Sequence, residues 1–159
     1  LAKLSEKLNM LAPRQGTPEG GRAFEDWFYD LISYFELPHR RPYVVDHREI
    51  DGSITIGDTT YLVELKFTTK PVGAPDVDVF RRKVESKADN TMGVMVSMSD
   101  YTAPAKKSAS GQRSPILLLG FRHLYVILHG VFKMDELVSR VRQHASQTGR
   151  AFLEVNELG

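Results

Sequence analysis

The chain has 159 residues, 42% of them apolar and 26% charged, which predicts one globular domain large enough to bury a core. It contains no cysteine, so disulfides, thiolate metal sites and a cysteine nucleophile are excluded. Lysine and arginine number 21 and aspartate and glutamate 20, a net charge of +1. Because the composition carries no excess of positive charge, any nucleic-acid role must depend on where the basic residues lie.

Residues 1–36 predict two helices separated by a loop. Leucines at helical spacing predict a helix over residues 1–12, and the Pro- and Gly-rich residues 13–21 predict a loop. A broad apolar stripe predicts a helix over residues 22–36. We expect residues 1–18 to be an N-terminal helix and linker remnant and residues 19–159 to be the main domain. The chain begins with Leu1 rather than Met, so we expect it to be a piece of a larger protein.

The rest of the chain predicts antiparallel strands followed by alternating helices and strands. Strands are predicted at 43–50, 53–56, 60–68, 91–98, 114–119 and 151–155, and helices at 76–88, 101–109, 121–128 and 134–147. Turn dipeptides at Asp51-Gly52 and Gly57-Asp58 predict a meander of hairpins, and Gly149 is expected to stop the last helix. This order predicts an α/β fold in which helices cover a mixed sheet. No apolar run reaches the length of a membrane helix and no signal peptide is visible, so a cytoplasmic location is expected.

The strand around residues 61–67 carries the most informative side chains. Glu64 and Lys66 are two apart and therefore point to the same face, with Cα atoms about 6–7 Å apart. Charges in so apolar a strand are uncommon unless they are paired or functional. A hairpin that turns at Gly57-Asp58 would bring Asp51 toward Glu64. Two carboxylates and the main-chain carbonyl of Leu65 are oxygen ligands suited to Mg²⁺, and a lysine beside the ion suits phosphodiester hydrolysis.

Each of these residues also has a purely structural interpretation. Asp51 is a common residue of a tight turn, and Glu64 with Lys66 is a possible ion pair of an edge strand. Glu25 is a possible member of an exposed acidic helix face. Competing acids at Asp46 and Asp58 are better placed in a strand and a turn. We interpret His123 and His129 as packing or surface residues rather than metal ligands, because both flank apolar positions.

The residues Ile50-Asp51 and Glu64-Leu65-Lys66 resemble the D…(D/E)-x-K motif of the PD-(D/E)XK, or restriction-endonuclease-like, nuclease superfamily. Ile50 stands where that superfamily usually has proline. Residues 21–27 resemble its first helix, with Glu25 at the position of the helix glutamate, and residues 76–87 resemble the helix after the motif strand. Residues 92–105 resemble the following strand and turn, and the whole order is most similar to Mrr-type endonuclease domains. The resemblance spans residues 20–130.

This resemblance implies a three-layer α/β/α sandwich around a mixed sheet of mainly four to five strands, and a metal-dependent DNA endonuclease. It implies that Asp51, Glu64 and the Leu65 carbonyl bind Mg²⁺, for which Mn²⁺ substitutes. Lys66 would orient the attacking water and stabilise the transition state. Glu25 would hold a metal-bound water or a second ion. A junction-resolving nuclease, an RNA-cleaving effector and a catalytically silent nucleic-acid-binding module of the same fold remain alternatives, as does a structural domain with internal ion pairs.

Basic residues supply candidate contacts to a DNA backbone. The candidates are Arg81, Arg82, Lys83, Lys87, Lys70, Lys106 and Lys107, although a solvated helix face explains such runs equally well. Lys83 is additionally a candidate to reach the active site from its helix. We expect a homodimer, for which the final apolar helices offer an interface unless they only close the core. We also expect a separate target-recognition domain outside this chain, part of a larger restriction or defence protein, and no membrane partner.

Overall fold

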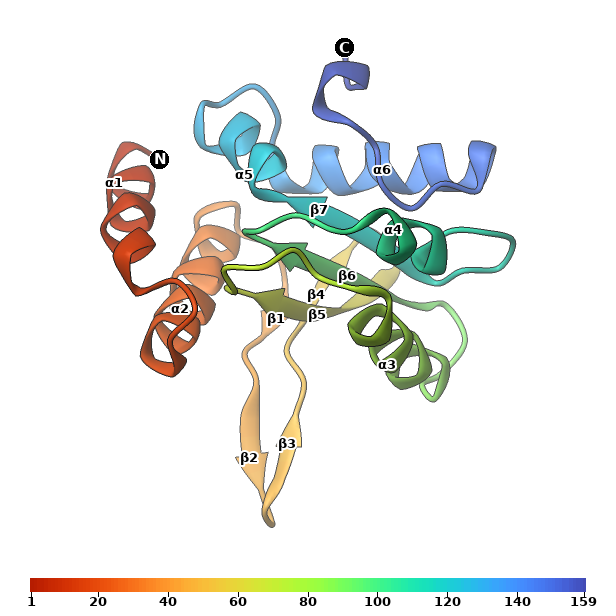
Figure 1. The fold of residues 1–159 in the computed structure, drawn as a ribbon, viewed down its shortest axis with the longest axis horizontal. Helices are drawn as coiled ribbons and strands as arrows, with labels where there is room; N and C mark the ends of the chain where they lie inside the picture. Colours follow the sequence, from red (N-terminus) through yellow and green to blue (C-terminus); the bar gives the residue numbers. More distant parts are fainter.

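The computed structural model describes all residues 1–159 as a five-stranded mixed sheet with helices on both faces (Figure 1). The helices are α1 (Ala2–Leu11), α2 (Pro18–Tyr34), α3 (Ala74–Glu85), α4 (Ala103–Ala109), α5 (Phe121–Leu128) and α6 (Met134–Thr148), with 3₁₀ turns η1 (Ala12–Arg14) and η2 (Val155–Glu157). The strands are β1 (His39–Arg40), β2 (Tyr43–Val45), β3 (Arg48–Ile50), β4 (Ser53–Ile56), β5 (Thr59–Lys66), β6 (Thr91–Ser97) and β7 (Ile116–Gly120). The predicted α/β fold with a mixed, helix-covered sheet is confirmed.

The strand order of the sheet is β1-β4-β5-β6-β7. β1, β4 and β5 are antiparallel neighbours, whereas β5, β6 and β7 run parallel and are joined through α3 and α4. Parallel strands need such crossover connections, whereas the antiparallel strands are joined by short turns. The predicted turn at Gly57-Asp58 is confirmed, since it joins β4 to β5.

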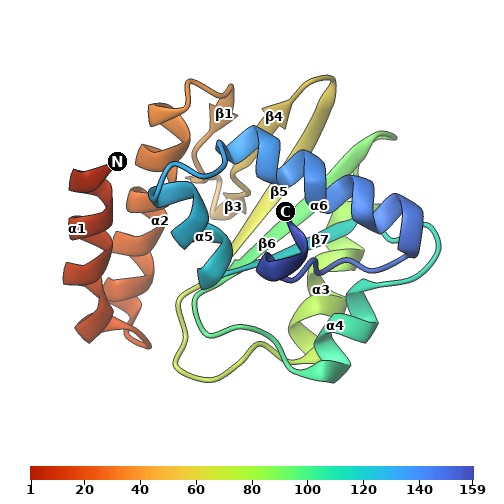
Figure 2. The ribbon, with the colours of Figure 1, turned by 90° about the horizontal axis from the view of Figure 1, so that it is seen from above.

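Two hydrophobic cores lie on opposite faces of the sheet, as the alternation of strand residues requires. Tyr61 and Val63 of β5 pack with α2, α5 and α6, whereas Leu62 packs with α3 and α4. Figure 2 shows α5 and α6 crossing one face of the sheet while α3 and α4 lie beneath it. The result is a three-layer α/β/α sandwich. Most apolar residues of α5 and α6 are buried in the core, with Tyr125 at 45% exposure the main exception, so these helices close the core.

The first helix packs on the domain rather than standing apart from it. Trp27 Nε1 donates a hydrogen bond to the Leu4 carbonyl at 2.8 Å, and Leu8 is buried in the core shared by α2 and the sheet. The division of the chain at residue 18 stays a prediction. None of the helices is long and apolar enough to span a bilayer.

Four local predictions were wrong. The second helix begins at Pro18, not at residue 22, because the Thr17 hydroxyl accepts the Gly20 N–H and proline fits the first helical position. The predicted strand 43–50 is a hairpin, β2–β3, that turns at Asp46 and His47. Asp51-Gly52 is not a turn but continues the chain from β3 into β4. Residues 151–155 form no strand, since they share only the Leu118 N–H to Ala151 carbonyl bond with the sheet.

Buried His123 fastens the C-terminal segment to α5. The Gly120 N–H donates to its Nδ1 at 2.8 Å, so Nε2 carries the proton and donates to the Leu153 carbonyl at 2.7 Å. Burial lowers the pKa of His123, although the Leu153 carbonyl and nearby carboxylates oppose this shift. The imidazole is therefore neutral in the folded protein and is a structural residue, as the sequence predicted.

We expect this histidine to make the protein less stable in mild acid. Because the folded pKa lies below the ordinary value of 6.5, the unfolded chain binds the proton first, so stability is full above that pH and falls as the pH drops below it. The slope for one group is at most about 1.4 kcal/mol per pH unit. Urea unfolding between pH 5 and 7 measures this slope. His123→Asn should flatten it, and an unchanged slope would contradict the assignment.

Candidate active site

The candidate site lies where one long hairpin bends away from the sheet. β1 with β2 forms one arm of this hairpin and β3 with β4 the other, and only β1 and β4 belong to the sheet. The arms separate at Pro42, which has no N–H to donate, and at Asp51 and Gly52 opposite it. Arg40 donates from Nη2 to the Asp51 carbonyl at 3.0 Å and so fixes the bend. Irregularities of this kind in a strand pair are a common way to aim an active-site side chain.

A glycine holds the bend against both α2 and β5. The Val63 N–H donates to the Gly52 carbonyl at 3.0 Å, which keeps Asp51 beside the strand that carries Glu64. A Cβ atom on Gly52 would overlap the hydroxyl of Tyr29 on α2, so no other residue fits without displacing the helix or the bend. Burial raises the pKa of Tyr29 well above its usual range, and the charges of Glu25 and Asp51 raise it further, so its hydroxyl stays protonated beside the cleft.

Lys83 of α3 places its ammonium between the two predicted metal-binding carboxylates. Its Nζ atom lies 3.1 Å from Asp51 Oδ1 and 3.6 Å from Glu64 Oε2. Burial alone would lower the pKa of Lys83, but the hydrogen bond to Asp51 and the negative charges of both carboxylates outweigh it, and the pKa is raised. The lysine is therefore charged, and one oxygen from each carboxylate already shares a single cation.

The cleft around these groups is small and acidic. Its volume is about 90 Å³, and the residues that line it are Glu25, Tyr29, Pro42, Glu49, Asp51, Gly52, Val63, Glu64, Leu65 and Lys83. Burial raises the pKa of Glu25, and the charges of Glu49, Asp26 and Glu64 raise it further. The repulsion among these carboxylates shows that the cleft holds more negative charge than the Lys83 ammonium neutralises. This excess favours the binding of a further cation.

Lys66 borders the cleft but approaches only Glu64. Its Nζ atom is 4.0 Å from Glu64 Oε1, as expected for neighbours on one face of a strand, and it makes no ion pair with Asp51. The Lys66 side chain is 27% exposed, so its ammonium can reach a molecule bound in the cleft. The structure thus brings Glu25, Asp51, Glu64 and Leu65 into one cleft with Lys66 at its border.

The oxygen atoms that line the cleft are of the kind that binds a divalent metal, although the side chains are not arranged around a metal position. No three acidic or histidine side chains converge as a metal-binding group. Mg²⁺ is commonly bound by one or two carboxylates together with waters and substrate phosphate oxygens. Asp51, Glu64 and the Leu65 carbonyl supply oxygens of this kind, and the Lys83 ammonium stands where a cation is attracted by both carboxylates.

The predicted phosphate-contacting residues are dispersed, and several are already engaged. Arg81 donates to Ser114 and its Nε atom is buried without a hydrogen-bond partner, while Lys106 pairs with Glu154 and lies over the Phe152 ring. Lys83 points into the cleft. The exposed ones are Lys70, Arg82, Lys87 and Lys107.

Glu49 and Tyr29 are cleft residues that the sequence analysis did not select. Glu49 and Asp51 are two apart at the end of a strand, and Glu25 and Tyr29 are four apart on a helix, so each pair shares a face. These spacings were readable in the sequence once Asp51 and Glu25 had been chosen.

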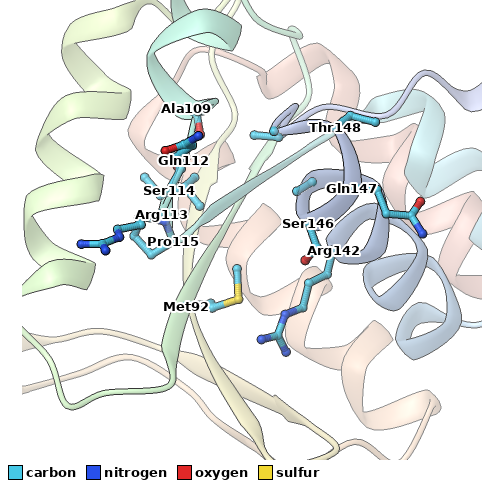
Figure 3. A pocket seen from close by; sticks show the side chains of 15 residues that line it. Met92, Ala109, Gln112, Arg113, Ser114, Pro115, Arg142, Ser146, Gln147 and Thr148 are labelled. Atoms are coloured by element: carbon cyan, nitrogen blue, oxygen red, sulfur yellow. The ribbon is translucent and has the colours of Figure 1, made fainter.

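A larger hollow of about 630 Å³ lies at the opposite ends of β6 and β7 (Figure 3). Arg113, Arg142, Gln112 and Gln147 line it with small residues and without any acid. In Figure 3 the guanidinium ends of Arg113 and Arg142 lie well apart, so the two side chains do not converge on one ligand. Arg142 is also used structurally, because it donates to Thr59 Oγ1 at 2.9 Å.

The sandwich and its sheet order define a restriction-endonuclease-like α/β domain. The sequence model of the Mrr_cat family, described as a restriction endonuclease, matches residues 21–127, more than half of the chain. The chain therefore belongs to this restriction endonuclease family, which makes it a nuclease domain. The resemblance to Mrr-type domains is thus confirmed. No curated protein and no solved structure gives a significant match.

Proposed function

We propose that the chain is a Mg²⁺-dependent DNA endonuclease domain whose active site is the cleft at Asp51 and Glu64. The observation that carries this proposal is the position of the Lys83 ammonium, 3.1 Å from Asp51 Oδ1 and 3.6 Å from Glu64 Oε2. One carboxylate from the bend between β3 and β4 and one from β5 converge on one cation, as a metal-binding pair must. An ion held by Asp51, Glu64 and the Leu65 carbonyl would supply positive charge to the scissile phosphate.

The chain's own side chains account for the other requirements of phosphodiester hydrolysis. Lys66 would orient the attacking water and stabilise the negative charge that develops on the phosphate. Glu25 has a raised pKa, so it is suited to accept and release a proton or to hold a metal-bound water at the rim of the cleft. Asp51 and Glu64 are held in fixed geometry by the Gly52 and Val63 backbone contact, which favours a preorganised site.

We further propose that DNA is cut by a homodimer, since one cleft serves one strand, and that target choice involves a further domain of a larger restriction or defence protein. Leu137, Val138 and Val141 are buried in the core, so a dimer interface on the final helices would use exposed residues such as Tyr125, which is 45% exposed. We also propose that residues 1–18 attach to a core domain of residues 19–159, with Lys70, Arg82, Lys87 and Lys107 contacting the DNA backbone.

Incubation of the protein with supercoiled plasmid, branched DNA and RNA tests the proposal, each with Mg²⁺, Mn²⁺ or EDTA. We expect nicking of plasmid with either metal and none in EDTA. Faster cleavage of branched DNA would favour a junction nuclease, and cleavage of RNA alone would favour an RNA effector. Nicking that persists in EDTA would contradict the metal mechanism, and salt-sensitive DNA retention without cleavage would favour a silent binding module.

Lys83 yields a prediction about metal affinity that does not depend on cleavage. Because a metal ion must compete with its ammonium for the same carboxylate oxygens, Lys83→Met should lower the melting temperature in EDTA but increase the temperature shift that Mg²⁺ or Mn²⁺ produces. The apparent metal affinity should rise by about tenfold. Differential scanning calorimetry across a metal titration measures both effects.

Lys87→Met is the matched control, because Lys87 is exposed beyond the end of α3 and makes no ion pair. It should leave the metal-induced shift unchanged. Equal metal-induced shifts in Lys83→Met and the unaltered protein would show that the metal binds away from Asp51 and Glu64.

A further inference from the structure

The hairpin β2–β3 projects from the domain as an arm whose strands do not pair with the five-stranded sheet (Figure 1). Its strands pair only with each other, in the register Tyr43↔Ile50, Val44↔Glu49 and Val45↔Arg48. Asp46 and His47 at the tip both have positive φ angles, 50° and 63°, the signature of a tight two-residue turn that matches strand twist. Because an isolated two-stranded ribbon is only marginally stable in water, a regular arm of this kind is suited to a partner.

The arm exposes apolar side chains together with one arginine, Arg48, and two acids, Asp46 and Glu49. Tyr43, Val44 and Val45 are 49%, 71% and 46% exposed. Arg48 is exposed without an ion pair, and Arg40 at the base lies over the Tyr43 ring at 6.0 Å without a carboxylate partner. Exposed apolar groups beside both an arginine and acids favour the base edges of a duplex, which offer methyl groups, hydrogen-bond acceptors and hydrogen-bond donors.

The base of the arm forms part of the wall of the cleft. Pro42 and Glu49 at the base of the arm line the cleft, and Ile50 directly precedes Asp51. Any polymer whose backbone enters the cleft must therefore pass beside the arm. The three paired positions of the arm span about 10 Å, comparable to the depth of the DNA major groove, about 8.5 Å.

We propose that this arm, residues 43–50, inserts into the major groove of duplex DNA next to the phosphate bound in the cleft. This inference rests on the proposed function. The major groove admits a two-stranded ribbon, thymine methyl groups there accept apolar contacts, and guanine edges and phosphates accept arginine. The arm thus contacts base edges from within the catalytic domain itself, in addition to any separate recognition domain.

Binding to a fluorescein-labelled 20-base-pair duplex, measured by anisotropy in EDTA, tests the arm without cleavage. We expect Val44→Asp and Arg48→Glu each to weaken duplex affinity by about tenfold while leaving the melting temperature unchanged. The matched controls are Val131→Asp, at a valine 63% exposed in the α5–α6 loop, and Arg150→Glu, at an exposed arginine after α6. Both controls should change affinity less than about twofold.

The outcomes separate this inference from the proposed function. Arm variants that bind like the unaltered protein overturn the inference even if plasmid nicking succeeds. Arm-dependent binding without any nicking supports the inference while the proposed function fails. Competition by netropsin, a minor-groove ligand, but not by methyl green, a major-groove dye, overturns the groove assignment. Conversion of a dimer into a monomer by Val44→Asp, seen by sedimentation without DNA, overturns it in favour of a self-interface.

Discussion

Asp51→Asn is expected to reduce plasmid nicking on the order of 10³-fold while the protein remains folded. The substitution keeps the shape of the side chain but removes the negative charge of Asp51. Glu64 is then the only carboxylate of the pair that can attract the metal ion. Lys83 retains Glu64 Oε2 at 3.6 Å, so the site keeps one ion pair and no buried charge is left without a partner. Initial rates of nicking with saturating Mg²⁺, together with circular dichroism of the variant, measure the effect.

Asp58→Asn provides the matched control for that measurement. Asp58 lies in the exposed turn between β4 and β5, and only its backbone carbonyl is engaged, by Asn90. Its replacement should leave nicking within about twofold of the unaltered protein. Equal losses in the two variants, or full activity in Asp51→Asn, would remove Asp51 from the proposed metal site.

The helices and strands were largely predictable where the spacing of apolar residues along the chain indicates which side chains are buried. The apolar stripe of α2 and the apolar strands β6 and β7 gave the correct elements, and Gly149 ends α6 with a positive φ of 76°. These features follow from side-chain spacing or from the backbone freedom of one residue, and neither depends on distant contacts.

The errors occurred where a cap, a proline or a backbone conformation, rather than the spacing of apolar residues, determines the local structure. Gly20 and Gly21 suggested a loop, but the cap by Thr17 and the proline at position 18 start the helix before them. Asp46 and His47 accept positive φ without glycine, so the turn inside residues 43–50 carried no usual turn signal. Tertiary context decides such positions.

The candidate site was predictable in its carboxylates and not in its lysines. The spacing of Asp51 and Glu64 across one hairpin implied that they approach each other, and the backbone bond from Val63 to Gly52 holds them there. The direction of the Lys83 side chain depends on how α3 packs against β5, which no local pattern encodes. The sequence therefore offered Lys83 both as a phosphate contact and as a residue able to reach the site, and in the structure its ammonium lies between Asp51 and Glu64.

Phe24→Ala is expected to destabilise the protein by about 3–5 kcal/mol and to lower its melting temperature by about 10 °C. Phe24 is fully buried on α2, and its ring stacks between Trp27 at 5.7 Å and Phe67 at 4.8 Å. Removal of the ring leaves a cavity bounded by two rigid aromatic side chains, which cannot collapse to fill it. Urea unfolding and calorimetry measure the loss.

The same stack connects stability to the site, because Phe24 precedes Glu25 and Phe67 follows Lys66. Tyr34→Ala is the control on α2, at a tyrosine 53% exposed, and should cost less than about 1 kcal/mol. If the stack also positions Glu25 and Lys66, Phe24→Ala will nick plasmid more slowly than the fraction of folded protein explains. This comparison is made at a temperature well below the melting point of the variant. Nicking in proportion to the folded fraction would restrict Phe24 to stability, and equal losses of stability in both variants would contradict the packing assigned to this core.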